Sequence, residues 1–291
     1  MKPAFPDLSQ ATVAIVGLGL MGGSLAAALK QQHACRRVVG IARRQATLDI
    51  ALAHGWIDVD TTSLAEGLAS ADVAVLATPP RVVLQQIRTV GPLLPAGSLL
   101  LDLASTKVDI VSAMENLPMN VHPIGGHPMC GKEQAGVEAA DPYLYRNRPF
   151  VLTPLARTPA GAVDLARAMV TAVGARPLLL DAETHDRRVA WASHLPHIVA
   201  VTLMRATMAA ADDDEDIWAL TAGGFRDTTR LAASSEEMMT DIFVTNRTEI
   251  LASAHQFHAR LTELCDLLEN GDDDTLARYL HEVTTRRREI R

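Results

Sequence analysis

Short apolar runs recur through the first 180 residues in the manner of buried strands. They cover residues 13–16, 37–41, 72–77, 98–103, 149–153 and 176–180. Stretches with helical periodicity lie between most of them, for example at residues 45–54, 80–90 and 159–173. Strands that alternate with helices predict a parallel sheet with right-handed crossovers. We therefore expect an α/β domain with a doubly wound sheet.

The pattern changes near residue 181, because no strand-like run follows it. Residues 181–210 predict a long helix that is kinked or loosened at Pro196. Residues 243–269 carry apolar side chains at helical spacing, and residues 275–287 predict a last helix. The second part of the chain is therefore expected to be all helical.

Two domains follow from this change of pattern. We expect an α/β domain over residues 1–181 and a helical domain over residues 182–291. The apolar stripe of residues 243–269 could form a dimer interface or, equally, the core of its own domain.

A glycine-rich turn, "GLGLMG" at residues 17–22, directly follows the first predicted strand. In a βαβ unit this GxGxxG pattern is typical of a dinucleotide-binding Rossmann domain. Gly17 permits the tight turn, Gly19 lets the backbone reach the pyrophosphate, and Gly22 lets the helix pack close to the sheet. Leu20 and Met21 complete the predicted cofactor-binding turn. The alternative is a glycine-rich packing turn without a ligand.

The same region, residues 11–29, is uncharged and approaches the length of a membrane span. Its glycines would be costly in a lone helix, and Lys2 is a poor basic flank. We therefore do not expect a membrane segment.

The residues after the second predicted strand bear on the choice of cofactor. Ala42 stands where an NAD-binding domain is expected to carry an acid, and Arg43 and Arg44 follow it. Guanidinium groups suit a 2′-phosphate, so NADP is favoured, while NAD remains possible because exposed arginines are also common on surfaces. Thr78 and Pro79, in "ATPP", end another predicted strand where cofactor-facing loops lie, although a plain turn is the alternative.

Composition narrows the class of protein. Apolar residues make up 48% and charged residues 21%, as in a soluble globular protein, and the net charge of −7 argues against nucleic-acid binding. The cysteines Cys35, Cys130 and Cys265 are odd in number and widely spaced, which favours a reducing cytoplasm over a disulfide framework.

Four further motifs carry chemical groups. They are "DLASTK" at 102–107, "GGHPMCGKE" at 125–133, "SHLPH" at 193–197 and "GGFRDTTR" at 223–230. His127 follows two glycines and precedes a proline, so we expect its backbone to be neither ordinary helix nor ordinary strand.

Each of these residues also has a purely structural interpretation. His127 and Cys130 with the two histidines of "SHLPH" match no common zinc spacing, so no metal site is expected. Ser105 could cap a helix, His194 could be a core histidine, and Asp227 could pair with Arg230 on a surface.

In order and approximate spacing, the glycine turn and these motifs resemble those of prephenate and arogenate dehydrogenases, the oxidative decarboxylases of tyrosine biosynthesis. The resemblance covers residues from about 10 to about 270. It implies an oxidoreductase with a Rossmann domain followed by a helical domain that forms a homodimer, acting on a small-molecule substrate. We expect neither a chorismate mutase segment before it nor a regulatory ACT domain after it.

The resemblance also implies roles for individual residues. His127 matches the catalytic histidine, and Ser105 matches a serine that bonds the substrate hydroxyl and orients that histidine. Arg230 matches the arginine that binds a substrate carboxylate, and His197 a substrate-contacting histidine. The polar network around this arginine is implied to include Glu133 and Asp227.

Substrate choice depends on Glu237. In the family an acid a few positions beyond the TR motif goes with arogenate, whose ammonium replaces the ketone of prephenate, and Glu237 matches that position. Arogenate is therefore favoured, with prephenate or dual specificity as the alternative. "SSEE" at residues 234–237 is also a capping box, so Glu237 could instead cap its helix.

Two other functions stay open. Another two-domain NADP oxidoreductase, such as a β-hydroxyacid dehydrogenase or imine reductase, would be expected to use a lysine or another acid on the long helix, and residues 182–210 contain no lysine. A nucleotide-sensing regulator would have no need of His127, Ser105 and Arg230 together.

Overall fold

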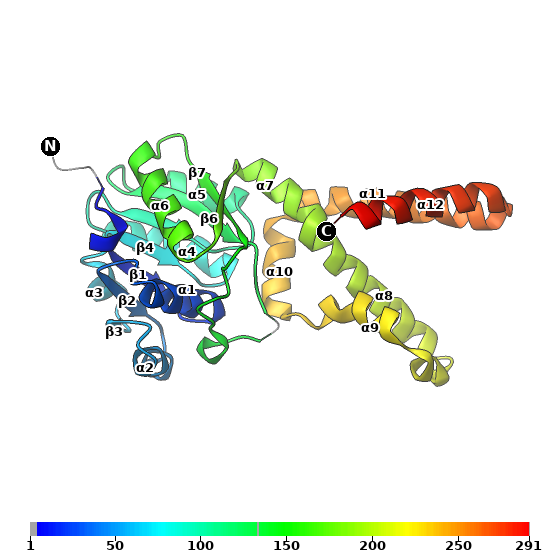
Figure 1. Cartoon of the computed structure of the whole chain (residues 1–291), viewed down its shortest axis with the longest axis horizontal. Helices are drawn as coiled ribbons and strands as arrows, with labels where there is room; N and C mark the ends of the chain where they lie inside the picture. Colours follow the sequence, from blue (N-terminus) through cyan, green and yellow to red (C-terminus); the bar gives the residue numbers. More distant parts are fainter. Residues whose placement is uncertain (1–4, 133, 291) are drawn as a thin grey trace.

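The computed structural model describes residues 5–132 and 134–290. Within this part of the chain, eight strands form one sheet in the order β3-β2-β1-β4-β5-β6-β7-β8, and the long helices of the second half extend away from it (Figure 1). The strands are β1 (Thr12–Val16), β2 (Arg37–Ile41), β3 (Val59–Thr61), β4 (Val73–Leu76), β5 (Leu99–Asp102), β6 (His122–Pro128), β7 (Pro149–Pro154) and β8 (Arg176–Leu179).

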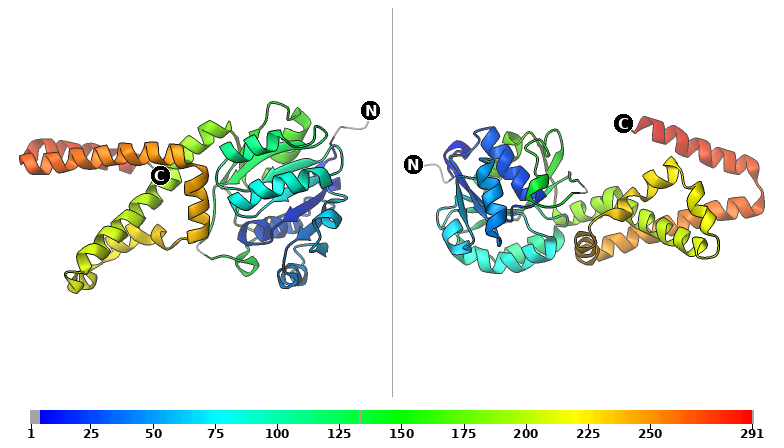
Figure 2. Two further views of the ribbon diagram at one scale, coloured as in Figure 1. Left: turned by 180° about the vertical axis from the view of Figure 1, so that it is seen from behind. Right: turned by 90° about the horizontal axis from the view of Figure 1, so that it is seen from below.

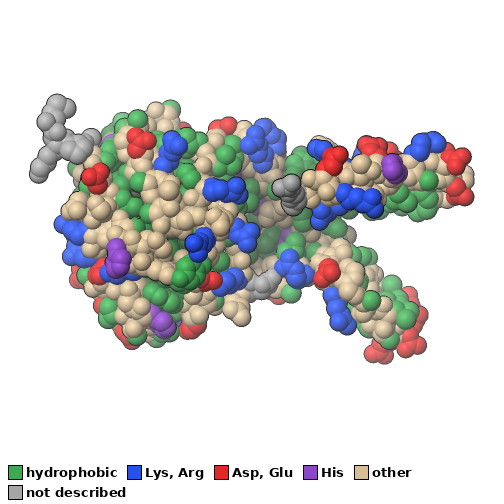
Figure 3. All heavy atoms as spheres, in the orientation of Figure 1, with side chains coloured by type: hydrophobic (Ala, Val, Ile, Leu, Met, Phe, Trp, Pro, Cys, Tyr) green, Lys and Arg blue, Asp and Glu red, His purple; other side chains and the backbone are tan. Residues whose placement is uncertain are grey.

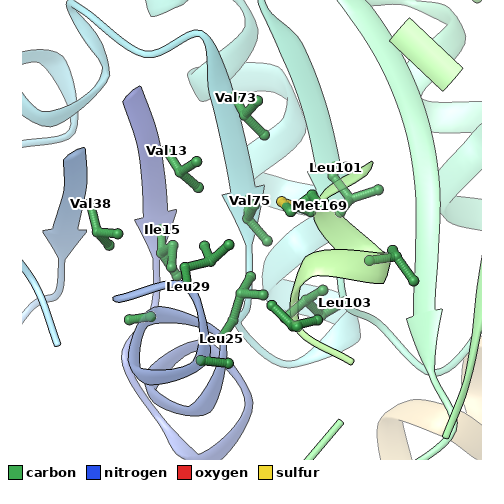
Figure 4. Close-up of a cluster of buried hydrophobic side chains, with 14 of the residues drawn as sticks. Val13, Ile15, Leu25, Leu29, Val38, Val73, Val75, Leu101, Leu103 and Met169 are labelled. Carbon is green, nitrogen blue, oxygen red and sulfur yellow. The ribbon is translucent and has the colours of Figure 1, made fainter. Parts of the chain in front are cut away.

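Helices cover both faces of the sheet, which confirms the predicted fold class. They are α1 (Leu20–Gln31), α2 (Gln45–Ala53), α3 (Leu64–Leu68), α4 (Pro80–Val90), α5 (Val108–Glu115) and α6 (Ala160–Ala172). One core, part of it shown in Figure 4, joins alternate side chains such as Val13 and Ile15 of β1 to Leu25 of α1 and Met169 of α6. A second core packs the other face against α3, α4 and α5. Strands that are buried on both faces explain the continuous apolar runs of the sequence.

The sheet is not parallel throughout. The pairs from β3 to β6 are parallel, as expected, but β7 runs antiparallel to β6 and β8 runs parallel to β7. Between β6 and β7 the described residues contain a 3-10 turn, Val137–Ala139, and no α-helix. A parallel pair needs a crossover, usually a helix, so the chain returns here in the opposite direction.

The helical part begins directly after the sheet. It contains α7 (Ala182–Val189), a π-helical turn (Ala190–His194), α8 (Leu195–Ala211), α9 (Gly223–Thr229), α10 (Glu236–Thr245), α11 (Arg247–Asn270) and α12 (Asp273–Glu289). The π turn lies just before Pro196, where the sequence predicts a loosened helix. The helix predicted over 243–269 is instead broken at Asn246, whose backbone leaves helical geometry with φ −125° and ψ 31°.

The helices α8 and α9 form one arm and α11 and α12 form another, as the two further views in Figure 2 show. On α11 the apolar stripe is largely exposed: Leu251 and Leu261 each keep 49% of their surface in this single chain. Hydrophobic side chains are visible on the surface of both arms in Figure 3. Only the start of the stripe contributes to a core, since Ile250 is buried with Ala190 and Ile242, and its later apolar side chains are half-buried or exposed. Across the residues that the structure describes, no helix is long and apolar enough to cross a membrane.

Candidate active site

The glycine turn connects β1 to α1 at the carboxyl end of the sheet. Gly17 has φ +97°, and a Cβ at this position would lie 2.8 Å from Thr78 Cγ2. A Cβ at Gly22 would lie 1.9 Å from the carbonyl oxygen of Gly17, so the turn tolerates no side chain there. Gly19 instead faces open space, since a Cβ at this position would meet no other atom within 4 Å. The turn is tightly packed at Gly17 and Gly22 but open at Gly19, which fits the close approach of a dinucleotide pyrophosphate.

The other predicted cofactor residues surround the same edge. Leu20 and Met21 form the first turn of α1, and Thr78 and Pro79 follow β4, next to Gly17. The Thr78 hydroxyl donates to Gln86 Oε1 at 2.7 Å. This clustering agrees with the predicted ligand edge of an open α/β sheet.

The two arginines lie beyond the end of β2, where the sequence predicts them. Arg43 and Arg44 are exposed, and Arg44 is the N-cap residue of α2. Ala42 is half-buried, and its amide donates to the Thr61 carbonyl at 3.4 Å.

His127 lies in a strand, contrary to the prediction. It belongs to β6 and pairs with Val151 of β7, while Gly126 pairs with Leu152. The two glycines before it do not have positive φ. They are needed for close packing, since a Cβ at Gly126 would lie 2.4 Å from the Asp102 carbonyl oxygen. The glycines therefore bring β6 close to β5 and leave His127 buried at the end of the strand.

A buried ion pair holds the backbone just before His127. The Lys107 ammonium contacts the Asp102 carboxylate, and both side chains are fully buried. Lys107 Nζ also donates to the Gly126 carbonyl at 2.8 Å, and the Gly126 amide donates to Asp102 Oδ1 at 2.9 Å. The carbonyl and the amide of Gly126 are thus hydrogen-bonded to the two partners of the same salt bridge. Asp102 and Lys107 are the first and last residues of the "DLASTK" motif, but the motif by itself predicts a role for neither.

The His127 side chain contacts His185, which in turn contacts Asp186, and the sequence motifs include neither of these two residues. Its Nδ1 lies 2.8 Å from His185 Nε2, and His185 Nδ1 lies 2.7 Å from Asp186 Oδ1. All three side chains are buried. Burial lowers the pKa of His127 well below its usual value, and His185, Lys107 and His194 lower it further. The imidazole of His127 is therefore neutral at physiological pH.

Ser105 is half-buried in the loop between β5 and α5, which is tied to the helical part. The next residue, Thr106, bonds Thr245 of α10 through their hydroxyls at 2.8 Å. The amides of Lys107 and Val108 donate to the Asp186 carboxylate at 2.7 and 2.9 Å. These bonds hold the Ser105 loop at the junction of the two parts of the chain.

His194 and His197 are both buried at the start of the long helical segment. His194 Nδ1 lies 3.2 Å from the Asn246 amide nitrogen, and burial lowers the pKa of His194 to about 4. His197 packs edge-on against the ring of Phe243, with ring centroids 5.7 Å apart, and burial lowers its pKa as well. Both rings are thus favoured in the neutral form.

The other predicted substrate residues lie farther along the helical part. Asp227 of α9, Arg230 of the 3-10 turn Arg230–Ala233 and Glu237 of α10 are exposed in the single chain. Figure 1 shows α9 on the far side of α10 from the sheet. The substrate-binding role that the motifs imply for Arg230 stays a prediction. Glu133 lies outside the described residues.

The N-cap of α10 bears on Glu237. Ser235 is the cap, and its hydroxyl accepts from the Met238 amide at 3.4 Å. A capping box needs an acid three residues after the cap, and that position is Met238, so Glu237 does not complete one. Its carboxylate remains exposed in the first turn.

The cysteines are all free, and burial raises the pKa of Cys130 to about 12, which keeps its thiol protonated. Among the described residues, no three His, Cys, Asp or Glu side chains converge as metal ligands.

The fold and these residues define a class, the two-domain oxidoreductases that bind a nicotinamide dinucleotide. Family models divide the chain in the same way: residues 25–179 match the prephenate dehydrogenase nucleotide-binding domain, and residues 181–282 match the prephenate dehydrogenase dimerization domain. The chain belongs to the prephenate dehydrogenase family, as its motifs indicate.

Individual relatives agree with this assignment. The prephenate dehydrogenase of Bacillus subtilis is 34% identical over 272 residues, which span 92% of this chain and 73% of that protein. The cyclohexadienyl dehydrogenase of Zymomonas mobilis is 31% identical over 272 residues, which span 93% and 92%.

Solved structures are also similar over nearly the whole chain. The prephenate dehydrogenase of A. aeolicus, in complex with hydroxyphenyl propionate and NAD+, matches with a TM-score of 0.92 and 31% identity, covering 98% of this chain and all (100%) of that one. The arogenate dehydrogenase of Synechocystis matches with a TM-score of 0.84 and 30% identity, covering 96% and 99%. The protein is thus a dehydrogenase of the prephenate and arogenate type.

Proposed function

We propose that the protein oxidises arogenate with NADP and releases CO2, which gives tyrosine in the cytoplasm. The substrate ring carries a hydroxyl at C4 and a carboxylate at C1. Loss of hydride from C4 and of CO2 from C1 leaves an aromatic ring, so the chemistry is strongly downhill. The protein must therefore mainly position the reactants and polarise the hydroxyl.

The observation that carries this proposal is the buried neutral imidazole of His127 at the end of β6. A neutral imidazole accepts the proton of the C4 hydroxyl as that oxygen becomes phenolic. Ser105 bonds the same hydroxyl and orients the ring. Its loop is bound to the helical part next to His127, which supports that role.

The carboxylates of the substrate need a cationic partner, and Arg230 is proposed to bind one of them in a bidentate pair. Asp227 and Glu133 belong to the polar network of this arginine, and His197 contacts the substrate. The buried His197 near the junction supports its part of this assignment.

When bound, the nicotinamide ring accepts the hydride. Gly17, Gly19 and Gly22, with Leu20 and Met21, are proposed to hold the pyrophosphate at the start of α1, with Thr78 and Pro79 beside it. The space left open at Gly19 supports this arrangement.

NADP is proposed because Ala42 leaves no carboxylate at the end of β2, while Arg43 and Arg44 are exposed there. The A. aeolicus structure contains NAD+, so NAD use by this chain is the alternative.

Arogenate is proposed because Glu237 offers an exposed carboxylate that is not engaged as a capping-box acid. A carboxylate pairs with the ammonium of arogenate and not with the ketone of prephenate. Prephenate, which would give 4-hydroxyphenylpyruvate, is the alternative substrate.

We also propose a homodimer formed through the helical part. The match to a dimerization domain and the exposed apolar side chains of α11 support this assembly. The test of the whole proposal is a four-way rate comparison of NADP and NAD against arogenate and prephenate. We expect the highest kcat/KM for NADP with arogenate, and no turnover of any pair would contradict the proposal.

A further inference from the structure

We propose that His185 and Asp186 are positioning residues that hold His127 in the tautomer a base requires and receive the charge of the proton it accepts. The three residues form a linear relay, His127–His185–Asp186. This inference rests on the proposed function of His127 as the base, and it adds the means by which a buried imidazole can act as one.

Two members of the relay, His185 and Asp186, lie on α7, and the start of this helix is well anchored. Asp181 caps this helix by accepting from the Thr184 amide at 2.7 Å, and the His185 amide donates to the Asp181 carbonyl at 3.0 Å. His185 is fully buried and Asp186 is 1% exposed. The rings of His127 and His185 meet edge-on, with centroids 5.0 Å apart and planes at 73°. This geometry directs a ring nitrogen of each toward the other.

Two other parts of the chain set the position of Asp186. Its two carboxylate oxygens accept from the amides of Lys107 and Val108 at the start of α5. Its backbone carbonyl accepts from the Asn246 side chain at 2.9 Å, at the break between α10 and α11. The carboxylate therefore cannot turn away from His185 without losing bonds to the sheet domain.

These contacts determine the tautomers of both rings. A carboxylate only accepts hydrogen bonds, so the Nδ1 of His185 carries a proton and donates it to Asp186. The Nε2 of neutral His185 is then an acceptor, and the Nδ1 of His127 must donate to it. The remaining nitrogen of His127, Nε2, keeps its lone pair free for the substrate hydroxyl.

The relay also accommodates the proton that the reaction releases. As the substrate hydroxyl gives its proton to Nε2 of His127, the Nδ1 proton can move to Nε2 of His185. His127 is then neutral again, and His185 becomes an imidazolium bonded to the Asp186 carboxylate. The formal charge of the three groups changes from −1 to 0, and the reverse transfers release the proton once product has left.

The surroundings show why such a transfer is useful. Lys107 and Asp102 face the relay from β5 and its loop, His194 from the π turn and Asp109 from α5. Burial and the nearby Lys107 oppose a positive charge on His127. Asp186 is hydrogen-bonded to His185 and not to His127, so a proton passed to His185 lies next to a carboxylate.

Two substitutions at one position separate the two roles. His185→Gln keeps a side-chain oxygen that can accept from His127 but cannot take up the proton, and His185→Leu removes both abilities. We expect kcat to fall about tenfold in the first and about 10²-fold in the second, with the KM values for substrate and cofactor nearly unchanged. The acid limb of the plot of kcat against pH should move to lower pH by about one unit in His185→Gln. In this variant the proton on His127 can no longer pass to a histidine beside Asp186.

Thr245→Val is the matched control, because it breaks the buried hydroxyl bond between Thr106 and Thr245 while leaving the relay in place. Because this bond also holds the Ser105 loop, the variant should lower both the melting temperature and kcat, but it should leave the acid limb where it is. A purely structural role for His185 predicts that all three variants behave alike. Wild-type kcat and an unmoved acid limb in His185→Gln would overturn the proposal.

A second measurement does not depend on turnover. In protein labelled with ¹⁵N-histidine and saturated with NADP, the ring nitrogens of His127 should show the proton on Nδ1 and none on Nε2, and His185→Gln should retain this pattern. A proton on Nε2 of His127 would refute the relay whether or not the enzyme turns over arogenate. Absence of turnover with both substrates would instead count against the proposed function alone. If His185→Leu does not fold, His185→Gln carries both tests.

Discussion

The α/β part and the helical part bury their apolar side chains very differently. In α1, which has 12 residues, the buried residues run without a gap from Gly22 to Leu29. In α11, which has 24 residues, only Ile250 and Ser253 are buried among the residues described. The sheet closes two cores within one chain, whereas the helical part leaves its stripe uncovered. One half of the chain thus encloses its own cores, while the other half leaves exposed the apolar surface through which a homodimer is proposed to form.

The candidate site is divided in the same way. His127 lies on the sheet, where the Lys107 and Asp102 pair and the His185 relay hold it from several sides. Arg230 and Glu237 lie on exposed turns of the helical part. The proposed base is therefore held in place by contacts within the chain itself, whereas the residues proposed to bind substrate are exposed in the single chain.

The largest effect should follow from His127→Asn on the preorganised side. The variant loses the imidazole proposed to take the hydroxyl proton, so kcat should fall roughly 10²-fold or more, as measured by NADPH formation at saturating substrate. NADP binding, followed by the quenching of tryptophan fluorescence, should be intact. An unchanged kcat would remove His127 from the mechanism.

The next effect concerns the pH dependence of stability, which involves the buried His194 at the junction of the two parts of the chain. The folded pKa of His194, about 4, lies below the unfolded value of 6.5, so the unfolded chain takes up this proton first as pH falls. The contribution of neutral His194 to the free energy of unfolding is fully present above pH 6.5. It falls by about 2 to 3 kcal/mol as the pH falls toward 4.

Urea titrations between pH 7 and pH 4 can check this. The unfolding free energy of His194→Asn should fall less steeply over this range than that of the wild type. His127 and His197 contribute in the same direction in both proteins, since burial lowers their pKa values too. Equal slopes would show that His194 does not drive the pH dependence.

A charge on the exposed stripe should affect assembly next. Leu261→Glu places a carboxylate at a position that is 49% exposed in the single chain, and it should weaken a homodimer by about 2 kcal/mol or more. Light scattering across a dilution series measures this. Leu52→Glu, on the surface of the α/β part with 45% exposure, is the control and should leave the molar mass unchanged. An equal response of both variants would place the interface elsewhere.

A smaller effect is expected at the cofactor edge. Arg43→Ala removes a guanidinium proposed to pair with the 2′-phosphate, so the KM for NADP should rise about tenfold or more while the KM for NAD changes little. Steady-state kinetics with both cofactors measure this. If the two KM values rise equally, Arg43 does not contact the phosphate.

The smallest effect is expected at Glu237. Glu237→Gln removes the carboxylate proposed to pair with the ammonium of arogenate, so the ratio of kcat/KM for arogenate over prephenate should fall about fivefold. Glu236→Gln, one residue earlier in the same helix turn, is the matched control. A ratio that stays constant in both variants would leave Glu237 without a role in substrate choice.

Most of the α/β part could be predicted from local pattern. Six strands lie within a residue or two of their predicted ends, since each is a continuous apolar run. The short β3 has an exposed or half-buried surface, and β6 contains "HPIGGHP", so neither resembles such a run.

The break at Asn246 in the helical part is not predicted for a related reason. The apolar spacing continues through it, while the Asn246 amide bonds Asp186 and His194 in other helical segments.

The sequence alone determines the α/β class, the dinucleotide turn and the family. These rest on apolar runs, glycine spacing and short motifs, which are properties of neighbouring residues. The hydrogen bond from His127 to His185 joins positions 58 residues apart, and the carboxylate of Asp186 meets amides 79 and 78 residues away. Such contacts exist only once the strand and the helix have packed together, because packing sets which side chains meet, and no local pattern records them.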